Sequence, residues 1–215
     1  MALVPLRAPL DALQPRSIPW GLEMAAGRLV EITGGRDTAA LTMAVRFVHD
    51  AQQAGQQAAW IALSDGLFFP PDLLTNGVDL RALVVVRVPD GAAGARAADR
   101  LIRSAAFGAV VVDAGPALRI PTPLLARLAS LAQRHHTALV FLTQGGGPGQ
   151  AGVPSVDAAR RGASPLGSLI SLRVRARRQR LAAGRFRCWL EVLKDKRRGP
   201  TWRYDEVCRG APGMR

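Results

Sequence analysis

Residues 34–41 read Gly-Gly-Arg-Asp-Thr-Ala-Ala-Leu, and they lie where a phosphate-binding loop would be expected. Such a loop has the pattern G-x-x-x-x-G-K-[ST]: its backbone N–H groups surround the phosphates, its lysine supplies charge and its hydroxyl holds Mg²⁺. Counted from Gly34, the second glycine is Ala39, the lysine is Ala40 and the Ser/Thr is Leu41. The loop is therefore predicted to keep the backbone of a nucleotide site without its charged and metal-binding side chains.

The same residues permit a simpler interpretation, because a Gly-Gly turn joins strand to helix in many α/β proteins. Residues 28–33 (RLVEIT) read as a buried strand and those from Ala40 onward as an amphipathic helix, so an ordinary tight turn also fits. Weak nucleotide binding through backbone N–H groups, Arg36 and Thr38 stays open as well. Hydrolysis is not expected, since phosphoryl transfer depends on positioned charge.

The basic residues concentrate near the C-terminal end of the sequence. Residues 160–215 contain 16 of the 29 Lys+Arg and 4 of the 16 Asp+Glu, and nearly all of the net charge of +13 lies there. In residues 1–159, by contrast, 13 arginines and 12 carboxylates almost cancel. Such an asymmetry indicates a polyanionic partner, with nucleic acid as the first candidate.

Two segments in this basic region, residues 171–178 and 185–193, alternate apolar with mostly basic side chains, as half-exposed strands do. If they pair as a hairpin, the arginines of the two strands are expected to face one another, which is destabilising unless an anion neutralises them. DNA phosphate is the preferred anion, and an acidic partner or nearby carboxylates are the alternatives. The arginines concerned are Arg173, Arg175, Arg177, Arg185 and Arg187, and the nearby carboxylates are Glu191, Asp195, Asp205 and Glu206.

The predicted DNA-binding residues are Arg160, Arg161, Arg173, Arg175, Arg177, Arg178, Arg185, Arg187, Lys194, Lys196, Arg197 and Arg198. Trp189, Trp202 and Tyr204 are interleaved with these basic side chains. They fit two roles equally: stacking on unpaired bases, or packing in a core or interface.

Strand-like and helical segments alternate through the first two thirds of the sequence. Short apolar runs without alternation predict buried parallel strands at residues 28–33, 58–63, 83–86, 109–112 and 138–142. Helical patterns lie between them at residues 37–55, 70–76, 90–107 and 123–136, with Asp90 as an N-cap and Pro123 at a helix start. The expected fold is α/β: a mostly parallel central sheet covered by helices on both faces, ending in antiparallel strands.

Several classes of protein are not expected. The apolar runs are too short to span a membrane, and proline and charged residues interrupt any signal peptide in the first 15 residues. Cys188 and Cys208 lack C-x-x-C spacing, which indicates reduced thiols in a cytosolic protein. His135 and His136 have no third ligand nearby in the sequence. We therefore expect a cytoplasmic protein with no metal site and no cofactor.

Four segments, in order and spacing, resemble the RecA recombinase family: GRLVEITGG (27–35), AAWIALSDGLFFP (58–70), FGAVVVDAG (107–115) and LVFLTQ (139–144). The arginine-rich segments resemble the antiparallel strands that close that fold. The resemblance implies a short N-terminal arm (1–26), a RecA-like domain (27–207) with a flexible loop (144–168), and a C-terminal tail (208–215).

By this resemblance, Asp113 takes a metal-associated position and Gln144 a nucleotide-sensing position, while Ser64 replaces the catalytic carboxylate. Asp65 is a neighbouring, less favoured substitute for that carboxylate. From the residues alone, Asp113 also fits a strand-end or helix-capping acid, and Gln144 a surface loop residue. The degenerate nucleotide site is predicted to comprise Gly34, Gly35, Arg36, Thr38, Ala40, Leu41, Ser64, Asp113 and Gln144.

The pattern of losses is similar to that of the ImuA (SulA-like) family, the short RecA-like proteins of bacterial mutagenesis cassettes. That resemblance implies a non-catalytic DNA- and protein-binding adaptor in SOS-induced translesion mutagenesis. Its implied partners are DNA, the polymerase-like subunit of the cassette, and RecA, whose filaments it would modulate. Two alternatives stay open: an ATPase completed by Arg36 or by a partner's arginine, and a cell-division inhibitor with no DNA role.

Overall fold

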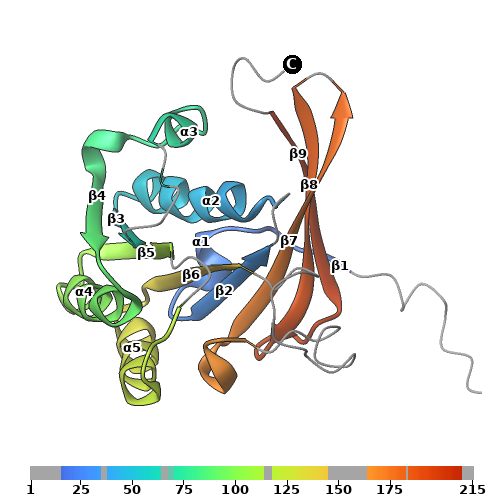
Figure 1. Ribbon diagram of the computed structural model, residues 1–215. Coiled ribbons are helices and arrows are strands. Elements are labelled where there is room, and N and C mark those ends of the chain that lie inside the picture. Colours follow the sequence, from blue (N-terminus) through green and yellow to red (C-terminus); the bar gives the residue numbers. More distant parts are fainter. Residues whose placement is uncertain are drawn as a thin grey trace, which may run out of the picture.

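The computed structural model describes residues 16–34, 38–63, 68, 70–113, 118–144, 164–182 and 184–209. These residues form a mixed sheet with the strand order β1-β9-β8-β7-β2-β6-β5-β3-β4 (Figure 1). The strands are β1 (Arg16–Ser17), β2 (Leu29–Gly34), β3 (Gln57–Leu63), β4 (Leu83–Val88), β5 (Phe107–Asp113), β6 (Ala138–Gln144), β7 (Leu172–Ala182), β8 (Arg185–Asp195) and β9 (Trp202–Arg209). The helices are α1 (Leu22–Ala25), α2 (Ala40–Gln53), α3 (Pro70–Leu74), α4 (Gly91–Arg103) and α5 (Thr122–His135), with 3-10 turns η2 (Leu80–Ala82) and η3 (Gly167–Leu169).

The parallel strands β2, β3, β5 and β6 form the centre of the molecule, and their side chains are buried on both faces. Helix α2 packs on one face of these strands, and α4 and α5 pack on the other (Figure 1). Strands enclosed in this way need apolar side chains on both faces, which is why their sequences show no alternation. The predicted fold class, with antiparallel strands at its end, is therefore confirmed.

The helix ends follow the local signals in the sequence. Asp90 caps α4, because its Oδ1 accepts a hydrogen bond from the Ala93 backbone N–H at 2.7 Å. Pro123 lies in the first turn of α5, and that helix ends at His136, which adopts a left-handed conformation with φ 54°. Among the described residues, no helix is both long enough and apolar enough to cross a bilayer.

Strand β4 is the exception to the prediction of buried parallel strands. It lies at the end of the strand order and pairs with β3, and the side chains of Val84 and Val85 are 38% and 41% exposed. The prediction of a buried strand over residues 83–86 was therefore wrong. Local composition cannot distinguish this strand from its neighbours, because its exposure follows from its place at the edge of the sheet.

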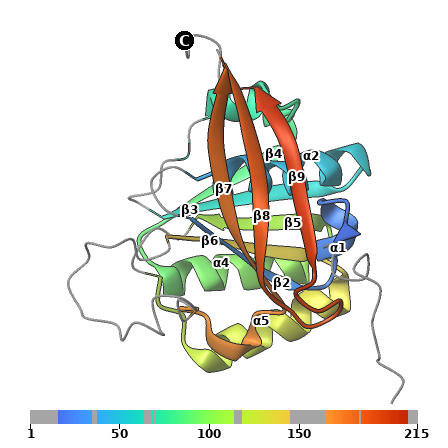
Figure 2. The ribbon, with the colours of Figure 1, turned by 90° about the vertical axis from the view of Figure 1, so that its right-hand side faces the viewer.

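The C-terminal strands form an antiparallel unit beside β2. Strand β7 runs parallel to β2, and β8 and β9 follow as antiparallel strands lying side by side (Figure 2). Leu172, Val174 and Ala176 face the core, as the alternation predicted, and Cys188 and Leu190 on β8 join them. This inner face packs on α2 and closes the core on that side.

The expected arginine-against-arginine pairing in the β7–β8 hairpin was wrong. Arg175 lies opposite Glu191, Arg177 opposite Trp189, and Arg187 opposite Gln179. Strand β7 continues to Ala182 before the chain turns at Gly184, whose φ is 68°. Arg173, Arg175 and Arg177 are therefore too far from the turn to lie opposite Arg185 and Arg187 at the start of β8.

The fold begins before residue 27, where the sequence placed the domain boundary. Strand β1 pairs with β9, and the Trp20 side chain is 2% exposed. The Trp20 indole N–H donates to the Met43 carbonyl at 3.0 Å, and its ring meets that of Phe47 edge-on with centroids 4.9 Å apart. Residues 16–26 are thus part of the domain, and β9 extends it to Arg209.

A buried ion pair joins the parallel and antiparallel parts of the sheet. Arg28, just before β2, contacts Asp195 at the end of β8, with 2.5 Å between Nη2 and Oδ1 and side-chain exposures of 1% and 0%. Burial lowers the pKa of Arg28. Burial acts to raise the pKa of Asp195, but hydrogen bonds from the Arg197 backbone and from the Arg28 and Trp202 side chains hold it below its ordinary value. The guanidinium of Arg28 also donates to the Ser171 hydroxyl and carbonyl at 2.9 and 3.0 Å, so the ion pair is the centre of a buried hydrogen-bond network.

Replacing Asp195 by Ala should lower the free energy of unfolding by about 3–5 kcal/mol, because a buried guanidinium is left unpaired. Urea denaturation measures this loss. Asp205→Ala is the matched control: its ion pair with Arg187 has side-chain exposures of 34% and 52%, so its removal should cost far less than removal of the buried pair. Equal, small losses in both variants would contradict the importance of the buried pair.

Candidate functional site

The carboxyl ends of the central strands meet at one edge of the sheet, beside the start of α2. Gly34 at the end of β2 lies opposite Gln144 at the end of β6, and Asp113 at the end of β5 lies opposite Leu142. In open α/β sheets this edge is where ligands bind. The structure thus brings together the main chain of Gly34, Asp113 and Gln144. Gly35, Arg36, Ser64, Asp65 and the side chain of Gln144 lie outside the described residues.

At the start of α2, the side chains that a phosphate loop needs are replaced by apolar ones. Ala40, at the lysine position, is 7% exposed and belongs to the core that α2 forms with the sheet. Leu41, at the Ser/Thr position, is 37% exposed. Neither side chain can neutralise a phosphate or hold Mg²⁺.

The Thr38 hydroxyl takes part in the fold of the loop. Its Oγ1 donates to the Ala176 carbonyl of β7 at 3.1 Å and accepts from the Ala40 backbone N–H at 3.1 Å. A Cβ at Gly34 would overlap this hydroxyl, which explains the glycine at the end of β2. The hydroxyl therefore fastens the helix start to β7, although Thr38 lies at the predicted nucleotide site.

Asp113 is a largely buried carboxylate at this edge. Burial raises its pKa, and among the described residues it has no ion-pair partner. An uncompensated carboxylate at this position has the chemistry of a cation ligand, since a bound cation would offset the cost of its charge. In the described part of the chain, no three His, Cys, Asp or Glu side chains come together as metal ligands.

Arg173, predicted to lie on an exposed basic ladder, is instead buried. Its Nε lies 3.2 Å from Oε2 of Glu31, a fully buried carboxylate in the middle of β2. Glu31 also accepts hydrogen bonds from the hydroxyls of Thr143, at 3.0 Å, and of Ser164. The sequence did contain a signal for Glu31, which is an acid inside an apolar strand. Such an acid needs a partner, because an unpaired buried charge is costly.

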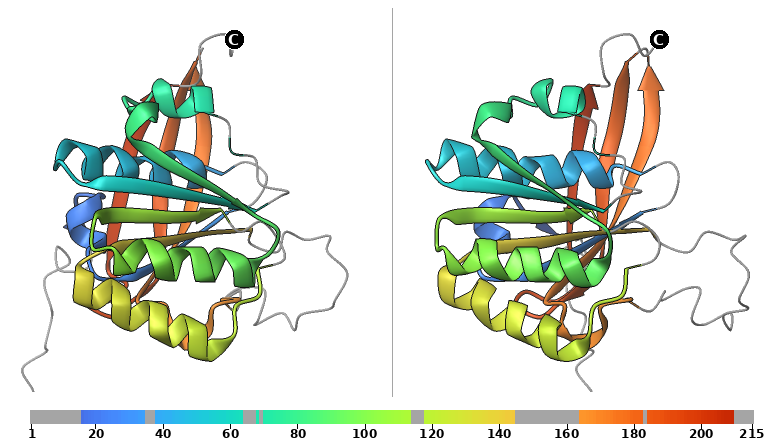
Figure 3. Two further views of the ribbon diagram at one scale, coloured as in Figure 1. Left: turned by 90° about the vertical axis from the view of Figure 1, so that its left-hand side faces the viewer. Right: turned by 60° about the vertical axis from the view of Figure 1, so that its left-hand side comes forward.

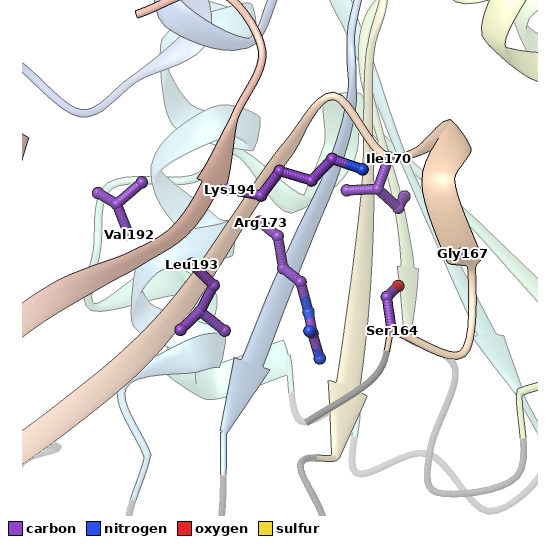
Figure 4. Close-up of a pocket in the computed structure, with 7 residues that line it drawn as sticks. All are labelled: Ser164, Gly167, Ile170, Arg173, Val192, Leu193 and Lys194. Atoms are coloured by element: carbon purple, nitrogen blue, oxygen red, sulfur yellow. The ribbon is translucent and has the colours of Figure 1, made fainter. Parts of the chain in front are cut away.

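Arg173 and Lys194 line a cavity of about 430 Å³ between β7, β8 and η3 (Figure 4). Ser164, Gly167, Ile170, Val192 and Leu193 complete its lining. The Lys194 ammonium donates to the Ser168 carbonyl at 3.0 Å. Burial lowers the pKa of Lys194, and the charges of Lys196 and Arg173 lower it further. The two cations thus belong to this recess rather than to the exposed strand surface.

The strand register defines a different basic surface, which we call the basic outer face. It comprises Arg175, Arg177, Arg185, Arg187, Trp189, Glu191, Arg203, Asp205 and Arg209, which share the outward side of β7, β8 and β9. Glu191 pairs with Arg175 and Arg177 at 3.3 and 3.2 Å, and Asp205 accepts from Arg187 Nε at 2.7 Å. The guanidinium group of Arg187 lies over the Trp189 ring, with its Cζ 5.8 Å from the ring centroid.

Three arginines of the basic outer face are exposed and make no ion pair within the described part of the chain: Arg185, Arg203 and Arg209. Sequence reasoning missed Arg203 and Arg209, although the alternation of residues 202–209 could have revealed them. Arg178, in contrast, lies over the Phe186 ring at 4.9 Å on the inner side. Lys196, Arg197 and Arg198 are exposed in the turn after β8, and Arg160 and Arg161 lie outside the described residues.

Of the aromatic residues considered for base stacking, Trp202 belongs to the core. It is 4% exposed, and its indole N–H donates to Asp195 Oδ2 at 2.9 Å. The Tyr204 hydroxyl donates to Glu206 at 2.8 Å on the inner side of β9. Trp189 is the aromatic side chain that lies on the basic outer face.

More than half of the sequence matches the model of a known protein family. The family model for the RecA N-terminal domain matches residues 20–140. The chain belongs to the RecA N-terminal domain family. The RecA proteins of Nocardioides sp. and Leifsonia xyli are 36% and 27% identical to it over 119 and 163 residues, which cover 53% and 64% of this chain. These matches span 33% and 45% of the two relatives, so the chain corresponds to less than half of each.

A likeness in fold extends over more of the chain than the family model does. The crystal structure of the RadB recombinase superposes with a TM-score of 0.58 and 17% sequence identity, covering 84% of this chain and 87% of that one. The likeness supports the fold, including strands that lie beyond the segment matched by the family model.

Asp113→Asn should stabilise the protein at neutral pH. Because burial raises the pKa of Asp113, the native state holds the proton more tightly than the unfolded state does. The ionised carboxylate therefore destabilises the fold increasingly as the pH rises from the unfolded pKa through the folded one. The gain in free energy of unfolding of the Asn variant over the wild type should vanish at pH values well below the ordinary pKa of aspartate and grow at pH values above it.

Urea unfolding at a series of pH values measures this advantage. Asp79→Asn, at an exposed position before η2, is the matched control. A pH dependence that is the same in both variants would rule out a special cost at Asp113.

Proposed function

We propose that this protein is a non-catalytic RecA-like adaptor that binds DNA and protein partners in damage-induced translesion mutagenesis. The observation that carries the proposal is the start of α2, where Ala40 is buried in the core and Leu41 replaces the metal-binding hydroxyl. The fold of an ATPase family is retained while the side chains that act on the terminal phosphate are replaced.

The chemistry of phosphoryl transfer supports the absence of catalysis. The transition state needs cations on the γ-phosphate and a group that orients water, and a single electrostatic group of this kind is worth about 10²–10³ in rate. At the lysine position the chain has Ala40, and at the position of the catalytic carboxylate it has Ser64. Asp113 alone provides one carboxylate and no positive charge.

The basic outer face supports a role in DNA binding. Its six arginines exceed its two carboxylates, so the local ion pairs leave most of the positive charge uncompensated. Arginine forks match phosphate geometry, and Trp189 offers a ring for stacking within the same surface. A protein that binds DNA here needs no nucleotide to do so.

The partners are proposed from family membership. RecA-family membership indicates a role in DNA recombination or repair. A chain with the RecA fold and an inactive nucleotide loop is suited to bind RecA and limit its filaments, and to bind the polymerase-like subunit of a mutagenesis cassette. The shared fold supplies the surface for recognition, and the inactive loop removes the response to ATP.

ATP turnover by the purified protein should stay at background, with or without single-stranded DNA. A sensitive phosphate-release assay measures it, with Asp113→Ala as the control variant. Turnover that requires DNA and disappears in Asp113→Ala would arise at this site. That result would favour an ATPase completed by Arg36 or by a partner.

DNA binding through the basic outer face should be strongly dependent on salt. With about five phosphates neutralised, log K should fall against log salt with a slope near −3.5 to −4.5. The variant Arg185→Gln/Arg203→Gln/Arg209→Gln removes no ion pair among the described residues and should flatten that slope by about 2–3. Fluorescence anisotropy with a labelled oligonucleotide measures both.

Arg46→Gln/Arg81→Gln is the control for a general loss of charge, because these exposed arginines lie on α2 and η2 and not on the basic outer face; Arg46 also pairs with Asp50 at 3.3 Å. If each removed charge changed the salt slope of DNA binding equally in both variants, the basic outer face would not be a specific binding surface. Wild-type protein without any salt-dependent DNA binding would favour a regulator that has no DNA role.

A further inference from the structure

A second set of arginines lies on α4 and α5, outside the region in which the sequence concentrates its charge. The two helices pack side by side on the face of the sheet opposite α2 (Figure 3). Ala95, Ala98 and Ile102 of α4 and Leu125, Leu128 and Ala132 of α5 are buried against the sheet. The exposed positions carry Arg96, Arg100, Arg103, Arg127 and Arg134, which we call the α4–α5 arginine face.

One carboxylate serves this whole surface. Asp99 is the only acidic residue in the sequences of the two helices, and its side chain is 15% exposed. It lies 3.2 Å from Nε of Arg103 and 2.6 Å from Nε of Arg127, so it links the two helices. Both contacts are made by Nε, and the side chains of Arg103 and Arg127 are 54% and 50% exposed, so both guanidinium groups stay accessible from solvent.

The remaining arginines of the face, Arg96, Arg100 and Arg134, make no ion pair within the described part of the chain. Favourable interaction with the C-terminal helix dipole explains the arginines in the last turns, which are Arg100, Arg103 and Arg134. It does not explain Arg96 and Arg127, which lie in the body of each helix. Arg96 and Arg100 are also four residues apart, a spacing at which like charges destabilise a helix.

We propose that the α4–α5 arginine face binds the phosphate backbone of duplex DNA, as a site separate from the basic outer face. This second site is independent of the function proposed above. Helix α4 packs on β3, β4 and β5, which are at the opposite end of the sheet from β8 and β9. The near-zero net charge of residues 1–159 does not predict this basic surface. The acids that balance its arginines in the sum, such as Glu31, Asp50 and Asp113, lie on other elements.

The composition of the face identifies the ligand. Neither helix contains a Phe, Tyr or Trp, so the face offers no ring for unpaired bases to stack on. The exposed large apolar side chains of the described residues lie on other elements, so the face lacks the anchors typical of a protein interface. What remains is a row of guanidinium groups, and phosphates on the outside of a duplex need only such charge and hydrogen-bond donors.

The test uses the full-length chain with Arg96→Gln/Arg100→Gln, both exposed and without ion pairs among the described residues. Anisotropy titrations with a short blunt-ended duplex and with oligo(dT) of equal length are compared between about 50 and 200 mM salt. Losing two phosphate contacts should flatten the slope of log K against log salt for the duplex by about 1.8. This change corresponds to about a sixty-fold loss of duplex affinity at 0.1 M salt. Binding of oligo(dT) should change much less.

The control Arg46→Gln/Arg81→Gln carries the same change in charge on other elements. Duplex affinity that is unchanged, or reduced no more than in this control, overturns the proposal. Unchanged duplex binding together with lost binding of polyglutamate also overturns it and identifies an acidic protein partner. Circular dichroism confirms that each variant is folded, and the Arg185/Arg203/Arg209 variant shows separately whether the basic outer face binds DNA.

Discussion

The ion pair between Arg28 and Asp195 is the interaction on which the arrangement of this molecule depends. It fixes the start of β2 to the end of β8 in a part of the core where neither charge reaches water. Three residues further along the chain, Glu31 pairs with Arg173 and joins β2 to β7 as well. Because an isolated buried charge is costly, each pair requires both partners, and the parallel and antiparallel parts of the sheet are held in one register. Strand β2 and the basic outer face are therefore positioned by the same contacts.

The start of α2 is held by contacts that do not involve a nucleotide. These contacts are made by the Thr38 hydroxyl, which bonds to β7, and by Ala40, which packs in the core. The start of this helix is thus maintained by packing and hydrogen bonds that do not depend on a lysine at position 40 or a hydroxyl at position 41. The cost that persists is the largely buried carboxylate of Asp113.

Much of the fold could be predicted from local patterns, because continuous apolar runs and helix caps are visible in the sequence. The limits appear where long-range pairing decides the outcome. The valines of β4 read like those of β5, yet one strand is at the edge and the other at the centre. Arg173 alternates with apolar residues like Arg175, but Glu31, distant in sequence, draws it into the core. Likewise, Trp20 joins the fold through partners on α2 and β9 that no local signal reveals.

The distribution of the tryptophans has an optical consequence. Trp20, Trp60 and Trp202 are 2%, 0% and 4% exposed, and their indoles are enclosed by protein. Trp189 lies on the outward side of β8, with a guanidinium over its ring. The intrinsic fluorescence of the molecule therefore has two sources. Three buried tryptophans report whether the core is folded, and Trp189 reports on the surface of β8. A ligand seated on β7–β9 is visible to this fluorophore, whereas one seated on α4 and α5 is spectroscopically silent.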